Sequence, residues 1–388
     1  MVKGRSRLTQ ASCRLDPTCM VNVDPMKTDL SRPEKRQLLE DGYVIVRNAV
    51  TDEAVTEARQ LIQSFLPSNE HILLVPPELA TNDKITGLFA DSALSVILQN
   101  VMGPFPPVVS CQVAVIPPFN RLGGIPGTHV DGGWSGRLPK TAQEIDLVTG
   151  RPKDALKYFG EHDEIRGTND GLLWQDPQRT LSYGSYTALV GIALNDQTVP
   201  GNGQFGVLRG MHEQVQDCFR KQRAAGGPIG PEGPGWPRVK IDSQGRPYSN
   251  GLPDDIREQA AELAKQSVAT DDWPWPELTP ILLNAGDAII ALHSLPHTPT
   301  PNSGPDPRMN IYFRIRRYRD GNPHEGSRRL AHGVSDHPDR GYFGQFLDYP
   351  SSYNPWQTSI DKLCDHWSEW DGMQDIVREQ ISIKQTSE

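Results

Sequence analysis

Cysteine is scarce in this sequence, and its spacing forms no metal-binding or redox motif. Five cysteines occur in 388 residues, at positions 13, 19, 111, 218 and 364, and no two of them form a C-x-x-C pair. An odd and scattered set of cysteines excludes a disulfide framework and favours a reducing compartment. We therefore expect an intracellular, cytoplasmic protein.

Long hydrophobic runs and a net positive charge are also missing. No stretch approaches the roughly 20 apolar residues that span a bilayer, and the N-terminus has no apolar segment of the signal-peptide type. The net charge of −9 disfavours binding to nucleic acid or to an anionic membrane. We expect neither partner, although the basic N-terminal residues leave targeting to an organelle open. Nothing in the sequence indicates an oligomeric state.

The N-terminal part is patterned as a tail, a short helix and a strand. Residues 1–30 read as a disordered or targeting tail. Ser31 and Glu34 then fit a capping box that opens a helix, and Gly42 would end it before a strand over 43–46. Two further helices are predicted, one from Thr51 and one over 91–102. The first of these carries apolar residues at helical spacing, namely Val55, Ala58, Ile62 and Phe65.

From Pro104 onward the chain changes to short apolar runs separated by Pro, Gly and Asn. Such runs predict an all-β core. They are VVSCQVAVI, YTALVGIALND, QFGVL, PILLNAGDAIIALH and MNIYFRIRR. We assign this core and the helices before it to one domain, residues 31–320.

Two long insertions interrupt the predicted core, at about 138–184 and 213–280. Loops of this length inside a compact barrel usually act as lids or substrate walls, and decoration without function is the alternative. The second insertion contains a Gly- and Pro-rich run and then a helix predicted over 254–269. Residues 321–388 read as a polar, aromatic-rich extension. We expect it to pack on the barrel and to end in a helix at about 357–384.

The stretch GTHVDGGW follows the strand-like run CQVAVIPPF, and it contains His129 and Asp131. In an extended segment, residues i and i+2 point to the same face, so the imidazole and the carboxylate would lie side by side and could hold a metal ion. The pairs His162/Glu164 and His337/Asp339 have the same spacing, but they lie in highly polar segments typical of a solvated surface. The first pair is therefore the candidate metal site.

A catalytic non-heme iron site needs a third protein ligand, commonly a second histidine. Downstream, a Gly-Asp turn leads into the strand AIIALH and then into a Pro-rich loop that carries His297. His293 competes with His297 for the ligand position, but it belongs to the strand before the loop. We favour His297.

The strand that follows opens at Arg308 and has one polar face. Arg308, Asn310, Tyr312 and Arg314 alternate with apolar residues along it, so they share that face and are expected to line a site. A guanidinium pairs bidentately with a carboxylate, so Arg308 could bind one end of a dicarboxylate such as 2-oxoglutarate while the other end chelates the metal. The simpler alternative is an ordinary surface arginine.

Taken together, His129-Val-Asp131, the Gly286-Asp287 turn, His297 and Arg308 resemble the phytanoyl-CoA dioxygenase (PhyH) family of iron(II)- and 2-oxoglutarate-dependent oxygenases. The runs EDGYVIVRNAVTDEAV and GIALNDQTVPGNGQFGVLRGMH are also similar to that family, and the resemblance extends from about residue 31 to 317.

The resemblance implies a mainly β fold with flanking helices, built on a double-stranded β-helix of the jelly-roll, cupin-like kind. It also implies iron(II) held by His129, Asp131 and His297, with Arg308 binding 2-oxoglutarate. Dioxygen would be the third reactant, and a small organic substrate would be oxidised, by hydroxylation in the first instance, with release of succinate and carbon dioxide. In the wider superfamily that the resemblance implies, members that halogenate lack this carboxylate and bind halide in its place, so Asp131 favours hydroxylation.

Three further residues have weaker assignments. Trp134 follows the metal motif closely enough to line the pocket, with a packed structural tryptophan as the alternative. Arg314 is a candidate to hold an anionic substrate group, with a solvent-facing arginine as the alternative. His212 ends a run where the family usually has Pro-Gly-Ser-His and this chain has Arg-Gly-Met-His. We interpret it as a structural turn residue.

Two other functions remain open at the level of sequence. A cupin-like hydrolase or isomerase could use the same ligands on zinc or manganese, because a His/Asp/His site does not identify a metal uniquely. A non-catalytic binding protein could keep the barrel and use the insertions for recognition.

Overall fold

A computed structural model describes residues 27–66, 77–105, 107–108, 111–118, 128–130, 145–146, 151–152, 187–224, 240–241, 247–248, 252–266, 278–315, 317 and 367–387. The predictions for the tail before residue 27, for most of the first insertion and for residues 318–366 lie outside these ranges. Asp131, Trp134 and the His162 and His337 pairs lie outside them as well.

Helix α1 (Arg32–Asp41) and strand β1 (Tyr43–Val46) form as predicted. The Glu34 carboxylate accepts a hydrogen bond of 2.8 Å from the backbone N–H of Ser31, as a capping box requires. Gly42 ends the helix with φ of 80°, a conformation that costs other residues energy. A side chain here would also collide with the ring of His212.

Helix α2 (Asp52–Phe65) begins at the predicted N-cap, Thr51, whose hydroxyl accepts from the N–H of Ala54. Val55, Ala58 and Ile62 are buried as expected, but Phe65 is 44% exposed, because it lies in the last turn of the helix. Helices α3 (Pro77–Ala80) and α4 (Asp83–Ala90) were not predicted. The predicted helix over 91–102 is α5 (Ala93–Met102), which Ser92 caps.

No single helix in the described ranges is both long and apolar enough to cross a membrane. Only the pair Glu78–Ala90 and Ala93–Met102, bent by 71° at its break, reaches the required length and composition when taken together.

Five antiparallel strands form the larger sheet, in the order β1-β10-β5-β12-β2. Their bounds beyond β1 are Ala288–Leu292 for β10, Ala188–Ala193 for β5, Arg308–Ile315 for β12 and Gln112–Ile116 for β2. Each strand overlaps an apolar run that predicted it. The run MNIYFRIRR is confirmed as the strand with one polar face.

The smaller sheet has the order β11-β6-β9, with β11 over His297–Pro299, β6 over Phe205–Val207 and β9 over Thr279–Pro280. An isolated antiparallel bridge between His129 and His297 extends it by one chain segment. His297 was expected in a loop, and it opens β11 instead, because it pairs with Val207 on one side and with His129 on the other.

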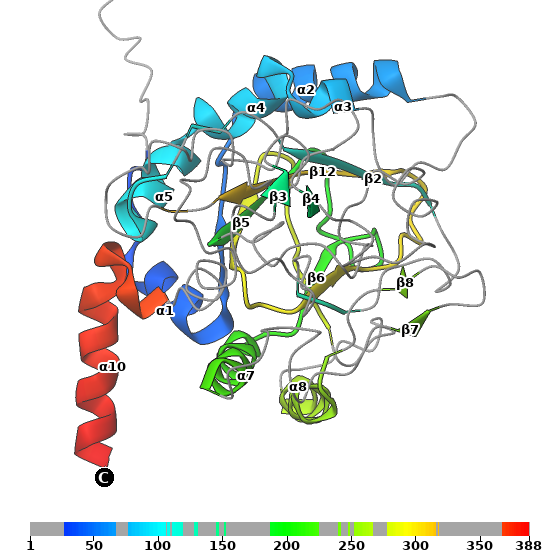
Figure 1. The fold of residues 1–388 in the computed structure, drawn as a ribbon. Helices are drawn as coiled ribbons and strands as arrows, with labels where there is room; N and C mark the ends of the chain where they lie inside the picture. Colours follow the sequence, from blue (N-terminus) through cyan, green and yellow to red (C-terminus); the bar gives the residue numbers. More distant parts are fainter. Residues whose placement is uncertain are drawn as a thin grey trace, which may run out of the picture.

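The fold is therefore mainly β with flanking helices, and its core is a double-stranded β-helix. Helices α2 to α5 cover one side of this core, and α7 (His212–Ala224) and α8 (Asp254–Gln266) lie on the opposite side (Figure 1). Two short hairpins, β3–β4 (Ile145–Asp146 and Arg151–Pro152) and β7–β8 (Lys240–Ile241 and Pro247–Tyr248), are also described.

Strand β12 separates two hydrophobic clusters, because its side chains alternate. Met309, Ile311 and Phe313 pack with the N-terminal helices on the outer face of the larger sheet. Tyr312 points the other way and packs with Phe205 of the smaller sheet in the barrel interior. The polar face of β12 thus faces the space between the sheets, where a site was expected.

The second insertion contains one helix that was predicted and one that was not. Helix α8 matches the prediction over 254–269 to within its last turn. Helix α7 was not predicted, and it packs Val215 and Phe219 against Ile256 and Ala260 of α8. Its charged residues lower its average hydrophobicity, so its apolar side is recognisable only with the partner helix in place.

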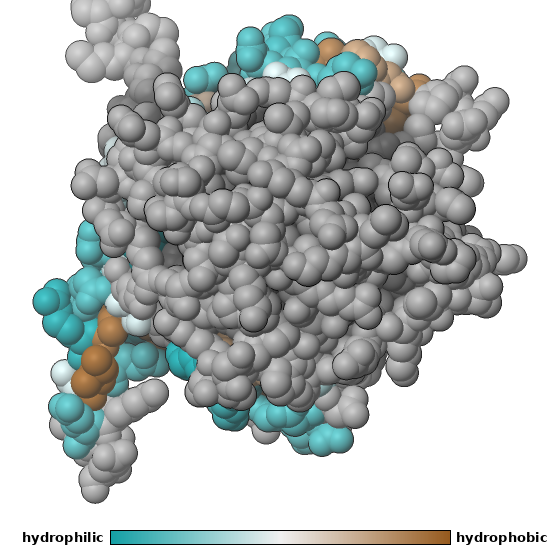
Figure 2. Space-filling model, in the orientation of Figure 1, coloured by the Kyte–Doolittle hydropathy of each residue, from teal (hydrophilic) through white to brown (hydrophobic). Residues whose placement is uncertain are grey.

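The described C-terminal residues, 367–387, form the short turns η4 (Trp367–Glu369) and η5 (Asp371–Met373) and helix α10 (Gln374–Ser387). Trp367 and Trp370 are buried, η5 lies against α5, and Glu379 pairs with arginines of α1. Helix α10 begins later than predicted, and the residues before 367 lie outside the described ranges. Its far end projects from the body and exposes apolar side chains (Figure 2).

Asp287 joins the Gly-Asp turn to the end of β1. Its buried carboxylate accepts hydrogen bonds from Arg47, from the N–H of Asn48 and from the N–H and side chain of Asn284. Burial alone would raise the pKa of Asp287, but these donors outweigh it, and the pKa lies below its usual value. The ionised carboxylate therefore stabilises the folded protein.

Replacing Asp287 with asparagine should lower the free energy of unfolding at pH 7 by on the order of 2–3 kcal/mol, because bonds to a buried charge are lost. A carboxyl with a lowered folded-state pKa stabilises above its unfolded pKa of about 4, and this contribution disappears as the pH falls through the folded value. The difference between wild type and Asp287→Asn should therefore shrink below about pH 4 in urea unfolding. Asp196→Asn, at an exposed turn aspartate, is the control and should show a much smaller difference at pH 7.

Candidate active site

Two predicted metal ligands, His129 and His297, face each other across the bridge at the edge of the smaller sheet. The N–H of each donates to the carbonyl oxygen of the other, at 3.0 and 2.9 Å. Residues that exchange both hydrogen bonds lie directly opposite, with their side chains on the same face. The two imidazole rings are accordingly close, with centroids 4.9 Å apart. This distance is suitable for two ligands of one metal ion.

The protonation of the His297 ring is set by a backbone contact. Nδ1 lies 2.9 Å from the carbonyl oxygen of Leu295. A carbonyl can only accept, so Nδ1 carries the hydrogen of the neutral ring and Nε2 carries the lone pair. Histidines that bind metals usually donate their other N–H in this manner, which fixes the tautomer and the ring orientation. His297 is buried and His129 is half-buried.

The side chains of His129 and Val130 point to opposite faces of the chain. Val130 is 1% exposed and packs outward with Met211, Val215 and Phe219 against the α7–α8 pair. The His129 side chain therefore lies on the face opposite to that of Val130. Asp131 itself lies outside the described residues. Within the described part of the chain, no third His, Cys, Asp or Glu joins the two histidines.

The other two histidines near these segments lie elsewhere. His293 follows β10 and packs on Phe219 of α7, with ring centroids 6.4 Å apart. His212 is fully buried, with Nε2 3.0 Å from the carbonyl oxygen of Leu39 and its ring 4.7 Å from that of Trp367. It therefore lies between α1 and the C-terminal segment, which agrees with a structural role. The ring of His297, and not that of His293, is the one that packs against His129, as expected if His297 is the second histidine ligand.

Arg308 opens β12 and is 1% exposed. Its Nε donates to the carbonyl oxygen of Gly203 at 2.7 Å, and its Nη1 donates to the hydroxyl of Tyr312 at 3.3 Å. A guanidinium has five N–H donors. Among the described residues, no carboxylate pairs with this one and no third acceptor lies within bonding distance. The simpler alternative of a surface arginine is wrong, because the side chain is buried in the barrel.

The burial of Arg308 has an electrostatic consequence. Loss of solvation lowers its pKa, and the neighbouring Tyr312 opposes that change. A guanidinium nonetheless keeps its charge at neutral pH. A buried cation without an anionic partner is unfavourable, and an anionic ligand would relieve that cost.

A polar network continues from Arg308 along the interior face of β12. The Tyr312 hydroxyl also accepts from Nδ2 of Asn310 at 2.9 Å, and Oδ1 of Asn310 accepts from Nε2 of Gln197 at 2.6 Å. Gln197 was not identified from the sequence. The only signal for it was its place in the run GIALNDQTVPGNGQFGVLRGMH.

Phe205 connects the histidine pair to the arginine, and it too was missed from the sequence. Its ring centroid lies 4.9 Å from that of His297 and 5.7 Å from that of Tyr312. Tyr312 in turn bonds to Arg308. One apolar wall therefore runs from the candidate metal site to the buried cation.

Arg314, the candidate for an anionic substrate group, lies farther along β12. It is partly buried, and its Nη1 donates to Oε1 of Gln112 on β2 at 2.8 Å. Trp134 lies outside the described residues. Neither residue is placed against a substrate by the described contacts, so both assignments remain predictions.

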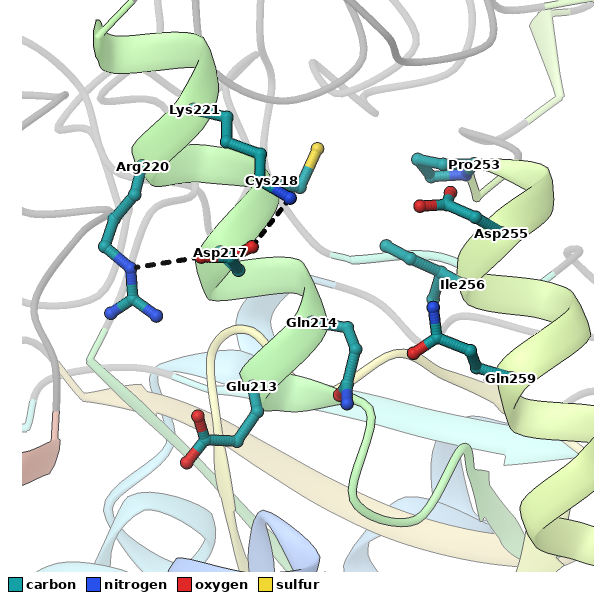
Figure 3. Close-up of a pocket in the computed structure, with 10 residues that line it drawn as sticks. All are labelled: Glu213, Gln214, Asp217, Cys218, Arg220, Lys221, Pro253, Asp255, Ile256 and Gln259. Carbon is teal, nitrogen blue, oxygen red and sulfur yellow. Dashed lines mark ion pairs between the residues drawn. The ribbon is translucent and has the colours of Figure 1, made fainter.

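A separate cleft of about 640 Å³ lies between α7 and α8 (Figure 3). Neither His129, His297 nor Arg308 lines it. On its α7 side, Asp217 pairs with Lys221 at 2.8 Å and with Arg220 at 3.8 Å. Burial and the nearby charge of Asp255 raise the pKa of Cys218 to about 11, so its thiol is protonated at neutral pH. Among the described residues that line the cleft, none is an ionised thiol nucleophile, and no group of three metal-ligating side chains occurs.

Comparison with known proteins identified similar folds among solved structures. No protein-family model matches the chain, and no curated protein matches its sequence. SnoK, a non-heme alpha-ketoglutarate-dependent carbocyclase from nogalamycin biosynthesis, is 16% identical over 74% of this chain and 85% of its own, with a TM-score of 0.39.

Two further solved structures have comparable similarity. HygX from Streptomyces hygroscopicus, with nickel, 2-oxoglutarate and hygromycin B bound, is 12% identical over 83% of this chain and 98% of its own, with a TM-score of 0.39. EctD from S. alaskensis, with 2-oxoglutarate and 5-hydroxyectoine, is 15% identical over 77% and 80%, with a TM-score of 0.37. Similarity of this degree carries no functional inference, so the function proposed below depends on the geometry of the site.

Proposed function

We propose that this protein is an iron(II)- and 2-oxoglutarate-dependent dioxygenase of the phytanoyl-CoA dioxygenase type. It would hydroxylate a small organic substrate with release of succinate and carbon dioxide. One observation carries the proposal: the same barrel interior holds a facing histidine pair and a buried arginine that has no anionic partner among the described residues.

The residues present fit such a site. His129 and His297 supply two imidazole ligands on one face of the sheet, and the His-x-Asp spacing supplies the carboxylate of Asp131. Arg308 supplies a fork of donors for the distal carboxylate of 2-oxoglutarate. Iron(II), when bound, would supply the activation of dioxygen, which is coupled to oxidative decarboxylation of 2-oxoglutarate.

The protein's own residues bind the cosubstrate, orient the metal ligands and exclude water from the site. The Leu295 carbonyl orients the His297 ring through Nδ1. Arg308 holds one end of the dicarboxylate and thereby directs the oxo-acid end toward the histidines. Phe205, which is 3% exposed, excludes water from the space between the histidine pair and Arg308. A water-free site limits side reactions of the oxidant.

The proposal can be tested without knowing the substrate. Iron(II) and then 2-oxoglutarate are added to apoprotein in the absence of oxygen, and the visible absorption spectrum is recorded for wild type and Asp131→Ala. We expect the weak charge-transfer band of chelated 2-oxoglutarate in wild type and none in the variant. That result would justify a substrate screen scored by succinate release.

This experiment and a partner-binding assay of the same two proteins separate the alternatives. A folded wild-type protein that binds metal but shows no band would contradict the proposal and favour a metal-dependent hydrolase or isomerase. A protein that binds its partner equally well after Asp131→Ala would instead favour a non-catalytic binding function.

A further inference from the structure

We propose that the hydroxyl of Tyr312 is the second donor to the distal carboxylate of 2-oxoglutarate, beside Arg308. This tyrosine would then set the preference for a dicarboxylic over a monocarboxylic oxo acid. The inference rests on the proposed function, because it concerns the cosubstrate of that same site.

The hydroxyl of Tyr312 lies between two donors. Nη1 of Arg308 donates to it at 3.3 Å, and Nδ2 of Asn310 donates at 2.9 Å. A phenol oxygen has two lone pairs and one hydrogen. With the Asn310 amide oriented as in the structure, both lone pairs accept a hydrogen bond, and the phenol hydrogen is then directed toward a third partner. No acceptor for it lies within bonding distance among the residues that the structure describes.

The hydrogen-bonding groups of Arg308 and Tyr312 that have no described partner are therefore all donors. The guanidinium retains N–H groups without a described acceptor, and the phenol retains its hydrogen. Both residues are buried, at 1% and 7% exposure, and no described carboxylate pairs with Arg308. The ligand that satisfies such a group of donors is an anion with several acceptor oxygens, such as a carboxylate.

Neighbouring residues of both sheets fix the position of the Tyr312 side chain. Gln197 donates to Oδ1 of Asn310 at 2.6 Å, which turns the Nδ2 of Asn310 toward the hydroxyl. Gly191 on β5 leaves space for the ring, because a Cβ at this position would lie 2.9 Å from Cε1 of Tyr312. Phe205 packs against the ring from the smaller sheet. A donor fixed before the ligand arrives costs little entropy on binding.

The test compares two ligands that differ only at the distal end. 2-Oxoglutarate and 2-oxopentanoate share the oxo-acid end, but 2-oxopentanoate has a methyl group in place of the distal carboxylate. Affinities of iron(II)-loaded wild type, Tyr312→Phe and Tyr43→Phe are measured by anaerobic calorimetry. Tyr43 is the matched control, because it is a buried tyrosine of the same interior cluster but lies on the edge strand β1, which β10 and β5 separate from β12.

We expect Tyr312→Phe to weaken 2-oxoglutarate binding by about 10- to 100-fold, as for one hydrogen bond to a charged group, and to leave 2-oxopentanoate binding unchanged. Tyr43→Phe should change neither affinity. Equal losses for both ligands, or no loss for either, would overturn the role of Tyr312 while wild-type binding still supported the proposed function. A wild-type protein that binds iron(II) but not 2-oxoglutarate would overturn both.

Discussion

His297→Ala is expected to abolish iron(II) binding at stoichiometric metal and to reduce 2-oxoglutarate turnover to background. The ring of His297 is paired with that of His129 and oriented by the Leu295 carbonyl. Loss of an outer partner of a metal ligand typically costs roughly 10- to 100-fold in metal affinity or activity, and loss of the ligand itself should cost more. Bound iron is measured by elemental analysis after anaerobic desalting, and turnover by succinate release.

His293→Ala is the matched control for this prediction. It also removes a buried histidine, because His293 is 5% exposed and His297 is 6% exposed. The two residues lie at opposite ends of the connection between β10 and β11. His293 packs on Phe219 rather than on His129, so its loss should reduce stability but retain stoichiometric iron. If His293→Ala lost iron and His297→Ala retained it, the ligand assignment would have to be exchanged between them.

Arg308→Met should nearly eliminate 2-oxoglutarate binding with little loss of stability. Two charge-assisted bonds to a carboxylate, each worth roughly 1.5–3 kcal/mol, correspond to a loss of affinity on the order of 10²- to 10⁴-fold. The same change removes a buried charge that has no described anionic partner, which offsets the lost bonds to Gly203 and Tyr312. We expect the free energy of unfolding without ligand to change by less than about 1 kcal/mol.

Calorimetric titration and urea unfolding of the same preparation separate these two effects. Arg314→Met is the control for 2-oxoglutarate binding, because it removes the same side chain from the same face of β12, where Arg314 bonds to Gln112. Its 2-oxoglutarate affinity should remain that of wild type. A large loss of stability in Arg308→Met with unchanged 2-oxoglutarate affinity would show that Arg308 is a structural residue.

Several features were predictable because they depend on near neighbours. The capping box at Ser31, the left-handed Gly42 and the N-cap at Thr51 all follow from local hydrogen bonding and backbone sterics. The polar face of β12 follows from strand alternation, and the structure confirms that it faces the interior. The His-x-Asp spacing belongs to this class, although Asp131 lies outside the described residues.

Other features were hidden because they depend on packing between distant segments. Helix α7 is stabilised by its contact with α8 and Val130, and its own sequence is too polar to predict that contact. The placement of His297 in a strand depends on pairing with both β6 and the His129 segment. Secondary structure is decided by tertiary contacts in such cases.

The sequence by itself therefore determined which residue types are available: two histidines, a carboxylate, an arginine and the alternation that gives each strand two faces. Only the tertiary structure decided which of them meet. It paired His129 with His297 rather than His293, buried Arg308 without a described anion and placed the Tyr312 hydroxyl between two donors. The physical reason is that local propensities act over a few residues, whereas strand register and core packing decide which distant side chains come into contact.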